Sequence, residues 1–79
     1  MNNLEKLNKV FVSTFNVEDS QVSELSYGNF NLWDSVGQMS LIANIEDAFD
    51  IMVEPEDIMD INSFLSAKDI LSEKYSIKF

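Results

Sequence analysis

The amino-acid sequence predicts an all-α protein, a bundle of three longer helices and one short helix with a long first loop. Apolar residues recur at helical spacing in three separate segments of the chain. The 79 residues include only one Pro and two Gly, so few positions would interrupt a helix. A chain of this length can form one modest core, and we therefore expect residues 1–79 to fold as a single domain.

The first helix is expected over residues 3 to about 15, and Asn2 with Glu5 resembles a capping pair at its start. Its inward face would carry Leu4, Leu7, Phe11 and Phe15. Residues 16 to about 34 show no sustained period, so we expect a long surface loop with a turn at Gly28. Apolar side chains would hold this loop on the core, namely Val22, Leu25, Tyr27, Phe30 and Leu32.

The second helix has the clearest pattern and is expected from Ser35 to about Phe49. Asp34 or Ser35 can cap its start, and Ser35 with Gln38 fits the capping-box pattern. Gly37 in the first turn would weaken the helix by about 1 kcal/mol relative to Ala. The apolar residues of this helix are Val36, Met39, Ile42, Ala43, Ile45, Ala48 and Phe49.

Two further helices are expected in the last third of the chain. Pro55 can begin a short helix that runs to about Asp60, because a residue in the first turn does not need its N–H group. Asn62 or Ser63 would then cap a last helix that ends near Tyr75. The residues expected to be buried in this part are Ile58, Ile61, Phe64, Ala67, Ile70, Leu71 and Tyr75.

Composition and charge argue against several classes of function. With no Cys and no His, the chain lacks a thiolate nucleophile, the usual general base near neutral pH and the commonest transition-metal ligands, so catalysis by this chain alone is disfavoured. Fourteen acidic residues against five basic ones give a formal net charge of −9, which disfavours nucleic acid and anionic membranes and attracts basic proteins. The sequence has no signal-peptide pattern and no apolar run of bilayer-spanning length, and we expect a cytoplasmic protein.

The most informative residues surround Ser35. Asp34-Ser35-Val36 stands at the start of the second helix, and Glu46-Asp47-Ala48-Phe49-Asp50-Ile51 closes it. Pro55-Glu56-Asp57-Ile58 and Asp60-Ile61-Asn62-Ser63-Phe64 follow at the two later helices. This arrangement resembles the acyl carrier protein family, whose mark is Asp-Ser-Leu at the start of a helix that ends in an acidic pair, Phe and another acidic residue. The resemblance covers nearly the whole chain and is weakest over residues 16–31.

The resemblance implies a free-standing acyl carrier protein in which Ser35 bears a covalent 4′-phosphopantetheine derived from coenzyme A. The Ser35 hydroxyl would attack the β-phosphate of coenzyme A on a separate phosphopantetheinyl transferase. The thiol of the attached arm would hold acyl intermediates as thioesters, so the chain itself would need no Cys. A helix N-terminus also favours an anion such as the phosphate, although an isolated Ser at that position is most simply a helix cap.

Two further groups of residues follow from the resemblance. The first would recognise the transferase and the acyl-loading and acyl-transferring enzymes, which have basic docking patches: Asp34, Val36, Glu46, Asp47, Asp50, Glu54, Glu56 and Asp57. The second would line a gap between the second and third helices that shelters acyl chains: Val36, Met39, Ala43, Val53, Ile58 and Ile61. Core packing is the simpler role for most of the second group, and solvation is the simpler role for any single acidic residue. We expect a monomer with no catalytic residue and no metal.

Several residues depart from the family pattern. Val36 stands where Leu is usual, and Gly37 and Ser40 occupy positions that are often acidic in fatty-acid carriers. Trp33 is expected as a large aromatic residue on the approach to Ser35. These departures favour a carrier for specialised lipid, polyketide or polysaccharide biosynthesis over the general carrier of fatty-acid biosynthesis.

Other interpretations use the same residues differently. An aminoacyl or peptidyl carrier would share Ser35 and its arm, and a helical interaction domain without a cofactor would use Ser35 only as a cap. A calcium-binding loop is excluded because residues 46–60 lack the central Gly that such a loop requires. Asp19-Ser20 is a second Asp-Ser pair, but no amphipathic run follows it, so we do not expect modification there.

Overall fold

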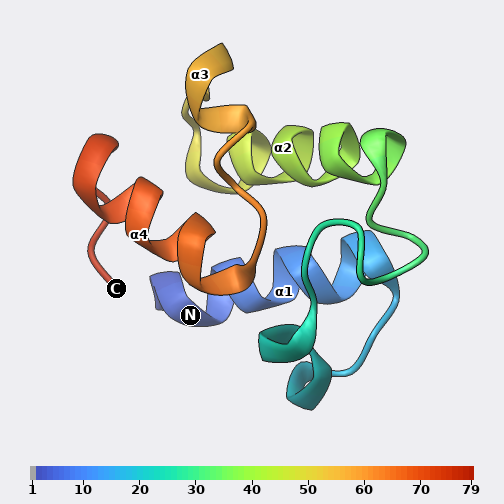
Figure 1. The fold of residues 1–79 in the computed structure, drawn as a ribbon. Coiled ribbons are helices and arrows are strands. Elements are labelled where there is room, and N and C mark those ends of the chain that lie inside the picture. Colours follow the sequence, from blue (N-terminus) through green and yellow to red (C-terminus); the bar gives the residue numbers. More distant parts are fainter. Residues whose placement is uncertain (1) are drawn as a thin grey trace.

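Residues 2–79, described here from a computed structural model, are mostly helical, which confirms the predicted all-α class. Five helical segments follow in order: α1 (Asn3–Phe15), η1 (Asp19–Glu24), α2 (Ser35–Phe49), α3 (Pro55–Ile58) and α4 (Phe64–Lys74). α1 and α2 lie along each other, η1 lies on the side of α1 away from α2, and α3 stands beside the C-terminal end of α2 (Figure 1). Within residues 2–79, no helix is long and apolar enough to cross a membrane.

α1 begins as predicted. The Asn2 side chain accepts a hydrogen bond from the Glu5 amide at 2.8 Å, and the Glu5 carboxylate accepts one from the Asn2 amide at 3.3 Å, which completes a capping box. The buried residues of this helix include the predicted Leu7, Phe11 and Phe15. Leu4 is 43% exposed instead and lines a second pocket together with Phe64.

The segment between α1 and α2 is more regular than the sequence predicted. Residues 19–24 form the 3₁₀ helix η1, which begins where the Gln21 side chain accepts a hydrogen bond from the Glu18 amide at 3.0 Å. A short 3₁₀ helix with one buried side chain, Val22, produces no sustained apolar period, so the sequence pattern did not predict it. Of the predicted anchors, Val22 and Leu25 are buried and Phe30 is half-buried, whereas Tyr27 and Leu32 are exposed.

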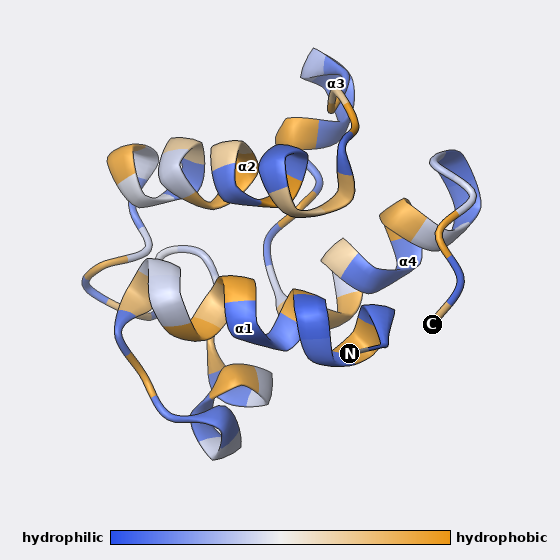
Figure 2. Ribbon diagram, turned by 180° about the vertical axis from the view of Figure 1, so that it is seen from behind, coloured by the Kyte–Doolittle hydropathy of each residue, from blue (hydrophilic) through white to orange (hydrophobic). Residues whose placement is uncertain are grey.

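Trp33 lies at the centre of the core and not on the approach to Ser35, so its predicted placement is wrong. Its side chain is 0% exposed, stacks on Phe15 with ring centroids 4.9 Å apart, and meets Phe11 edge-on at 5.6 Å. Its only donor is satisfied, because Nε1 donates to the buried Gln38 amide oxygen at 2.6 Å. Figure 2 shows the pattern behind this core, with apolar and polar residues alternating around the helices.

Asp34, and not Ser35, caps α2. The Asp34 carboxylate accepts a hydrogen bond from the Gly37 amide at 2.9 Å, and Ser35 is the first helical residue. The predicted capping box between Ser35 and Gln38 is wrong, because the Gln38 side chain is buried and makes other hydrogen bonds. Gly37 is required by packing, since a Cβ atom there would lie 2.0 Å from the carbonyl oxygen of Leu32.

The last two helices follow the prediction with small differences. α3 is shorter than expected and spans Pro55–Ile58. Ser63 caps α4, and its hydroxyl accepts a hydrogen bond from the Ser66 amide at 3.1 Å. An antiparallel bridge between Ser26 and Ser63 joins the first loop to the start of α4. This bridge brings the first loop beside the segment that links α3 to α4.

Candidate functional site

Ser35 is exposed at the start of α2, and its side chain does not cap the helix. Its Oγ atom forms a hydrogen bond of 3.3 Å with the hydroxyl of Tyr27. The first amide N–H groups of a helix have no helical partners, and here the Asp34 carboxylate pairs with that of Gly37. The remaining first-turn amides and the positive end of the helix dipole favour an anion bonded to Ser35. The residues at this helix start therefore fit a phosphate ester on Ser35 Oγ.

A pocket of about 720 Å³ opens beside Ser35. Its apolar lining consists of Met39, Ile58, Met59 and Ile61. Its polar lining consists of Ser26, Tyr27, Asn29, Ser35, Gln38, Asn62 and Ser63. The pocket therefore joins the first loop, the N-terminal half of α2 and the α3–α4 segment, and its mixed lining suits a small organic ligand.

Three of the predicted acyl-pocket residues lie together in this pocket, namely Met39, Ile58 and Ile61. Val53 is buried in the core, and it does not line the pocket. Val36 and Ala43 are two helical turns apart and share the exposed face of α2, with Val36 76% exposed. Neither residue lines the pocket, although Met39, about one helical turn from each of them on the same side of α2, does.

Gln38 is a site residue that the sequence predicted only as a capping partner of Ser35. Its amide nitrogen donates to the carbonyl oxygens of Ile58 at 2.7 Å and Ile61 at 2.8 Å, and its amide oxygen accepts from Trp33. Gln38 therefore fastens the end of α3 to the first turns of α2 and forms part of the pocket lining. The sequence gives one indication of this role. Gln38 is polar but lies three residues before Leu41 and four before Ile42, on the buried apolar face of the helix.

Most of the predicted acidic recognition surface is exposed. The exposed members are Asp34, Asp47, Asp50, Glu54 and Glu56. Glu46 is half-buried, and its carboxylate accepts a hydrogen bond from the Val53 amide at 2.9 Å. Glu46 therefore also holds the chain that crosses from α2 to α3.

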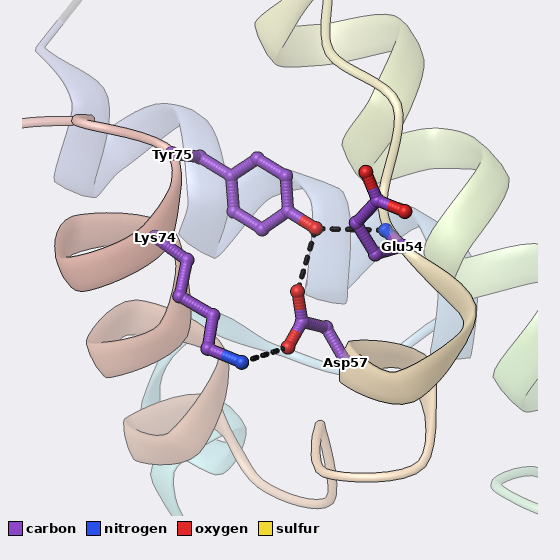
Figure 3. Close-up of polar contacts among 4 residues, drawn as sticks. All are labelled: Glu54, Asp57, Lys74 and Tyr75. Carbon is purple, nitrogen blue, oxygen red and sulfur yellow. Dashed lines mark hydrogen bonds and ion pairs between the residues drawn. The ribbon is translucent and has the colours of Figure 1, made fainter.

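Asp57 does not belong to an exposed acidic surface, because it is only 2% exposed. One oxygen of its carboxylate pairs with the Lys74 ammonium at 2.6 Å, and the other accepts from the Tyr75 hydroxyl at 2.7 Å. The Tyr75 oxygen in turn accepts from the Glu54 amide at 2.7 Å (Figure 3). We refer to Asp57, Lys74, Tyr75 and the Glu54 amide as the Asp57 cluster. It joins α3 to the end of α4, and no spacing pattern in the sequence indicates it.

The Asp57 cluster shifts the pKa values of its members. The hydrogen bond from Lys74, and then the one from Tyr75, lowers the pKa of Asp57 below its usual 3.8, although burial acts in the opposite direction. The same hydrogen bond raises the pKa of Lys74 above its usual 10.5. Burial is the main cause that raises the pKa of Tyr75 above 10.0. Near neutral pH the cluster therefore holds a carboxylate, an ammonium group and a neutral phenol.

Two other features bear on what the site can do. Among residues 2–79, no group of three or more potential ligand side chains could hold a metal ion. The second Asp-Ser pair lies at the start of η1 and not of an α-helix, and the Asp19 carboxylate accepts from the Asn8 amide at 2.8 Å.

We compared the chain with protein-family models, with curated proteins and with solved structures, and none of them matches it significantly.

Proposed function

We propose that this chain is a carrier domain that bears 4′-phosphopantetheine on Ser35. The observation that carries the proposal is the exposed Ser35 hydroxyl at the start of α2, where Asp34 provides the cap and the pocket opens alongside. The residues of this helix start and of the acidic end of α2 resemble the acyl carrier protein family, which supports the same function. The exposed helix start allows the hydroxyl to enter the active site of another enzyme.

Loading is a transfer of one phosphopantetheinyl group from coenzyme A. Ser35 Oγ forms a bond to the β-phosphorus of coenzyme A, the bond from that phosphorus to the oxygen that bridges to the α-phosphate breaks, and adenosine 3′,5′-bisphosphate leaves. The hydroxyl proton passes to a base on the transferase, since the chain has no His to accept it. The product phosphodiester carries its negative charge at the positive end of the α2 dipole.

The pocket favours acyl cargo over an aminoacyl group. When attached, the arm supplies a thiol that holds the cargo as a thioester. Met39, Ile58 and Ile61 form an apolar wall close to Ser35 that can shelter an acyl chain from water. We place this cargo in fatty-acid-related or specialised lipid, polyketide or polysaccharide biosynthesis.

The partner enzymes are expected to have basic docking patches. The exposed carboxylates at the end of α2 and the start of α3, with the net charge of −9, attract such patches and raise the rate of encounter. Glu54 and Glu56 belong to this proposed docking surface, whereas Asp57 does not because it is buried.

The proposal is tested by the intact mass of the protein after incubation with coenzyme A, magnesium and a broad-specificity phosphopantetheinyl transferase. The wild-type chain is expected to gain the mass of one phosphopantetheine. Ser35→Ala is expected to gain none, and Ser20→Ala, which removes the hydroxyl of the other Asp-Ser pair, is expected to gain one. Circular dichroism of each variant verifies that it is folded.

Two results would overturn the proposal. One is the absence of any mass gain on folded, unmodified wild-type protein while a known carrier is labelled in the same reaction. The other is a gain on Ser35→Ala that equals the gain on the wild type. Either result would favour a helical interaction domain without a cofactor.

A further inference from the structure

Tyr27 is held in place by backbone contacts on both sides. Its amide donates to the Asn62 carbonyl oxygen at 3.0 Å, and the neighbouring Ser26 forms the antiparallel bridge to Ser63. The next residue, Gly28, donates to the Trp33 carbonyl oxygen at 3.1 Å and has a φ of +84°, which Gly adopts without strain. The backbone of Tyr27 is therefore tied both to the start of α4 and to the chain just before α2.

The Tyr27 side chain reaches Ser35 from this fixed backbone. Its hydroxyl lies 3.3 Å from Ser35 Oγ, and both residues line the same pocket. A Tyr side chain has few rotatable bonds, so a fixed backbone restricts where its hydroxyl can go. Tyr27 is 46% exposed, so burial of the ring alone does not explain its position. The Tyr27 hydroxyl forms a hydrogen bond with Ser35, the residue that we propose is modified.

We infer that Tyr27 is a positioning residue whose hydroxyl donates a hydrogen bond to the phosphodiester on Ser35 and directs the arm towards the pocket. This inference rests on the proposed function of Ser35. In the modified protein the phosphorus is bonded directly to Oγ, so its non-bridging oxygens lie within reach of a hydroxyl that already contacts Oγ. A hydrogen bond to an ionised phosphodiester is stronger than one to a neutral hydroxyl. Loading therefore strengthens the contact that Tyr27 already makes.

The hydrogen bond from Tyr27 would restrict the direction in which the arm leaves Ser35. Tyr27 and Asn29 stand on the first-loop side of the pocket, and Met39 and Ile58 stand on the helical side. Because Ser35 and Tyr27 both line the pocket, a phosphodiester held by Tyr27 would begin the arm between these two sides. Without the hydroxyl, the arm keeps its covalent bond to Ser35 and loses this constraint on its direction.

Phosphorus NMR of the loaded protein tests the inference. The phosphodiester resonance of Tyr27→Phe is expected to be shifted from that of the wild type, because the variant lacks only the hydroxyl. Tyr75→Phe is the matched control, since the Tyr75 hydroxyl contacts Asp57 and the Glu54 amide instead of Ser35. Its phosphodiester resonance is expected to coincide with that of the wild type. A coincident resonance in loaded Tyr27→Phe would overturn the inference.

A second measurement needs no variant. The chain has two Tyr residues, so carbon NMR of protein labelled at the tyrosine Cζ atom gives one signal for each. Loading of Ser35 is expected to move the Tyr27 signal and leave the Tyr75 signal in place, and an unmoved Tyr27 signal contradicts the inference.

The intact mass distinguishes failure of the proposed function from failure of the role of Tyr27. An unloaded wild type removes the proposed function and the inference together, whereas a loaded protein with unchanged spectra removes only the role of Tyr27.

Discussion

At the start of α2, the adjacent residues Asp34 and Ser35 have separate roles. Both residue types are common helix caps, so either could have capped the helix. The structure gives the cap to Asp34 through its hydrogen bond with the Gly37 amide, which leaves the Ser35 hydroxyl exposed. An exposed hydroxyl without a capping role is available for modification.

Alanine substitution of each residue is expected to separate these roles. Asp34→Ala removes the cap and should lower the free energy of unfolding by about 1 kcal/mol. Ser35→Ala removes an exposed hydroxyl and should change it by less than about 0.5 kcal/mol. Urea denaturation of the unmodified proteins measures both. Equal losses in the two variants would mean that Ser35 also supports the helix start.

Gly37 gives a second prediction for a single residue. Helix propensity favours Ala over Gly by about 1 kcal/mol, so the sequence alone predicts that Gly37→Ala stabilises the protein. The structure predicts the opposite sign, because the new methyl carbon would lie 2.0 Å from the backbone oxygen of Leu32. We expect a loss of about 1–3 kcal/mol, as for other overpacked sites, measured by thermal or urea denaturation. Ser40→Ala, at an exposed position of the same helix, is the control and should be close to neutral.

At the scale of elements, α3 depends on side chains from its neighbours. It has four residues, which is too short for a helix to be stable by itself. Gln38 of α2 binds the carbonyl oxygens at and just after its end, and the Asp57 cluster joins it to α4. Glu46 holds the chain that leads into it through the Val53 amide. Because Ile58 and Ile61 line the pocket, their hydrogen bonds with Gln38 also support the wall of the pocket.

The Asp57 cluster predicts how stability depends on pH. Asp57→Asn should lower the midpoint of thermal unfolding at neutral pH, because Lys74 loses its buried charged partner. The pKa of Asp57 is lowered in the folded state. The stability that the wild type gains over Asp57→Asn is therefore fully present above about pH 5, and it is lost as the pH falls from 3.8 through the pKa of the folded state. The pKa values of Lys74 and Tyr75 are raised, so stability also falls as the pH rises above 10.0–10.5.

Thermal unfolding of the two proteins from pH 2 to pH 11 measures this dependence. The negative charges of Glu56 and Asp60 also raise the pKa of Lys74, so Asp60→Asn at an exposed position serves as the control for removal of one negative charge. Its difference from the wild type is expected to be small at neutral pH. A wild-type advantage over Asp57→Asn that stays constant down to pH 2 would contradict the role of the Asp57 carboxylate.

At the scale of the whole molecule, charge repulsion opposes folding. The chain holds fourteen acidic and five basic residues, and folding brings the like charges closer together. Salt shortens the range of this repulsion, from a Debye length of about 30 Å at 0.01 M to about 3 Å at 1 M. We therefore expect the midpoint of thermal unfolding to rise by several degrees between low and high concentrations of sodium chloride. A fall over this range would indicate that attractive pairs such as Asp57–Lys74 outweigh the general repulsion.

The helical elements could be predicted because their signals are local. Apolar spacing and the caps at Asn2 and Ser63 depend on residues within a few positions of each other, and the structure contains these caps. The prediction failed where the deciding contact lies further along the chain or in the core. Trp33 is buried because it packs against Phe11 and Phe15 of α1. The contacts that hold the buried Asp57 come from Lys74 and Tyr75, which follow it by seventeen and eighteen residues.

The same distinction applies to the candidate site. Sequence alone determined the helical class, the position of Ser35 at the start of the second helix and the excess of negative charge, because helical period, helix starts and composition are written along the chain. Only the tertiary structure decided which residues lie around Ser35 and its pocket. It brought Tyr27 to the Ser35 hydroxyl, placed Gln38 beneath the pocket and removed Asp57 from the acidic surface. These assignments depend on which segments pack together. The packing of the buried aromatic core determines these neighbours, and no local sequence pattern does.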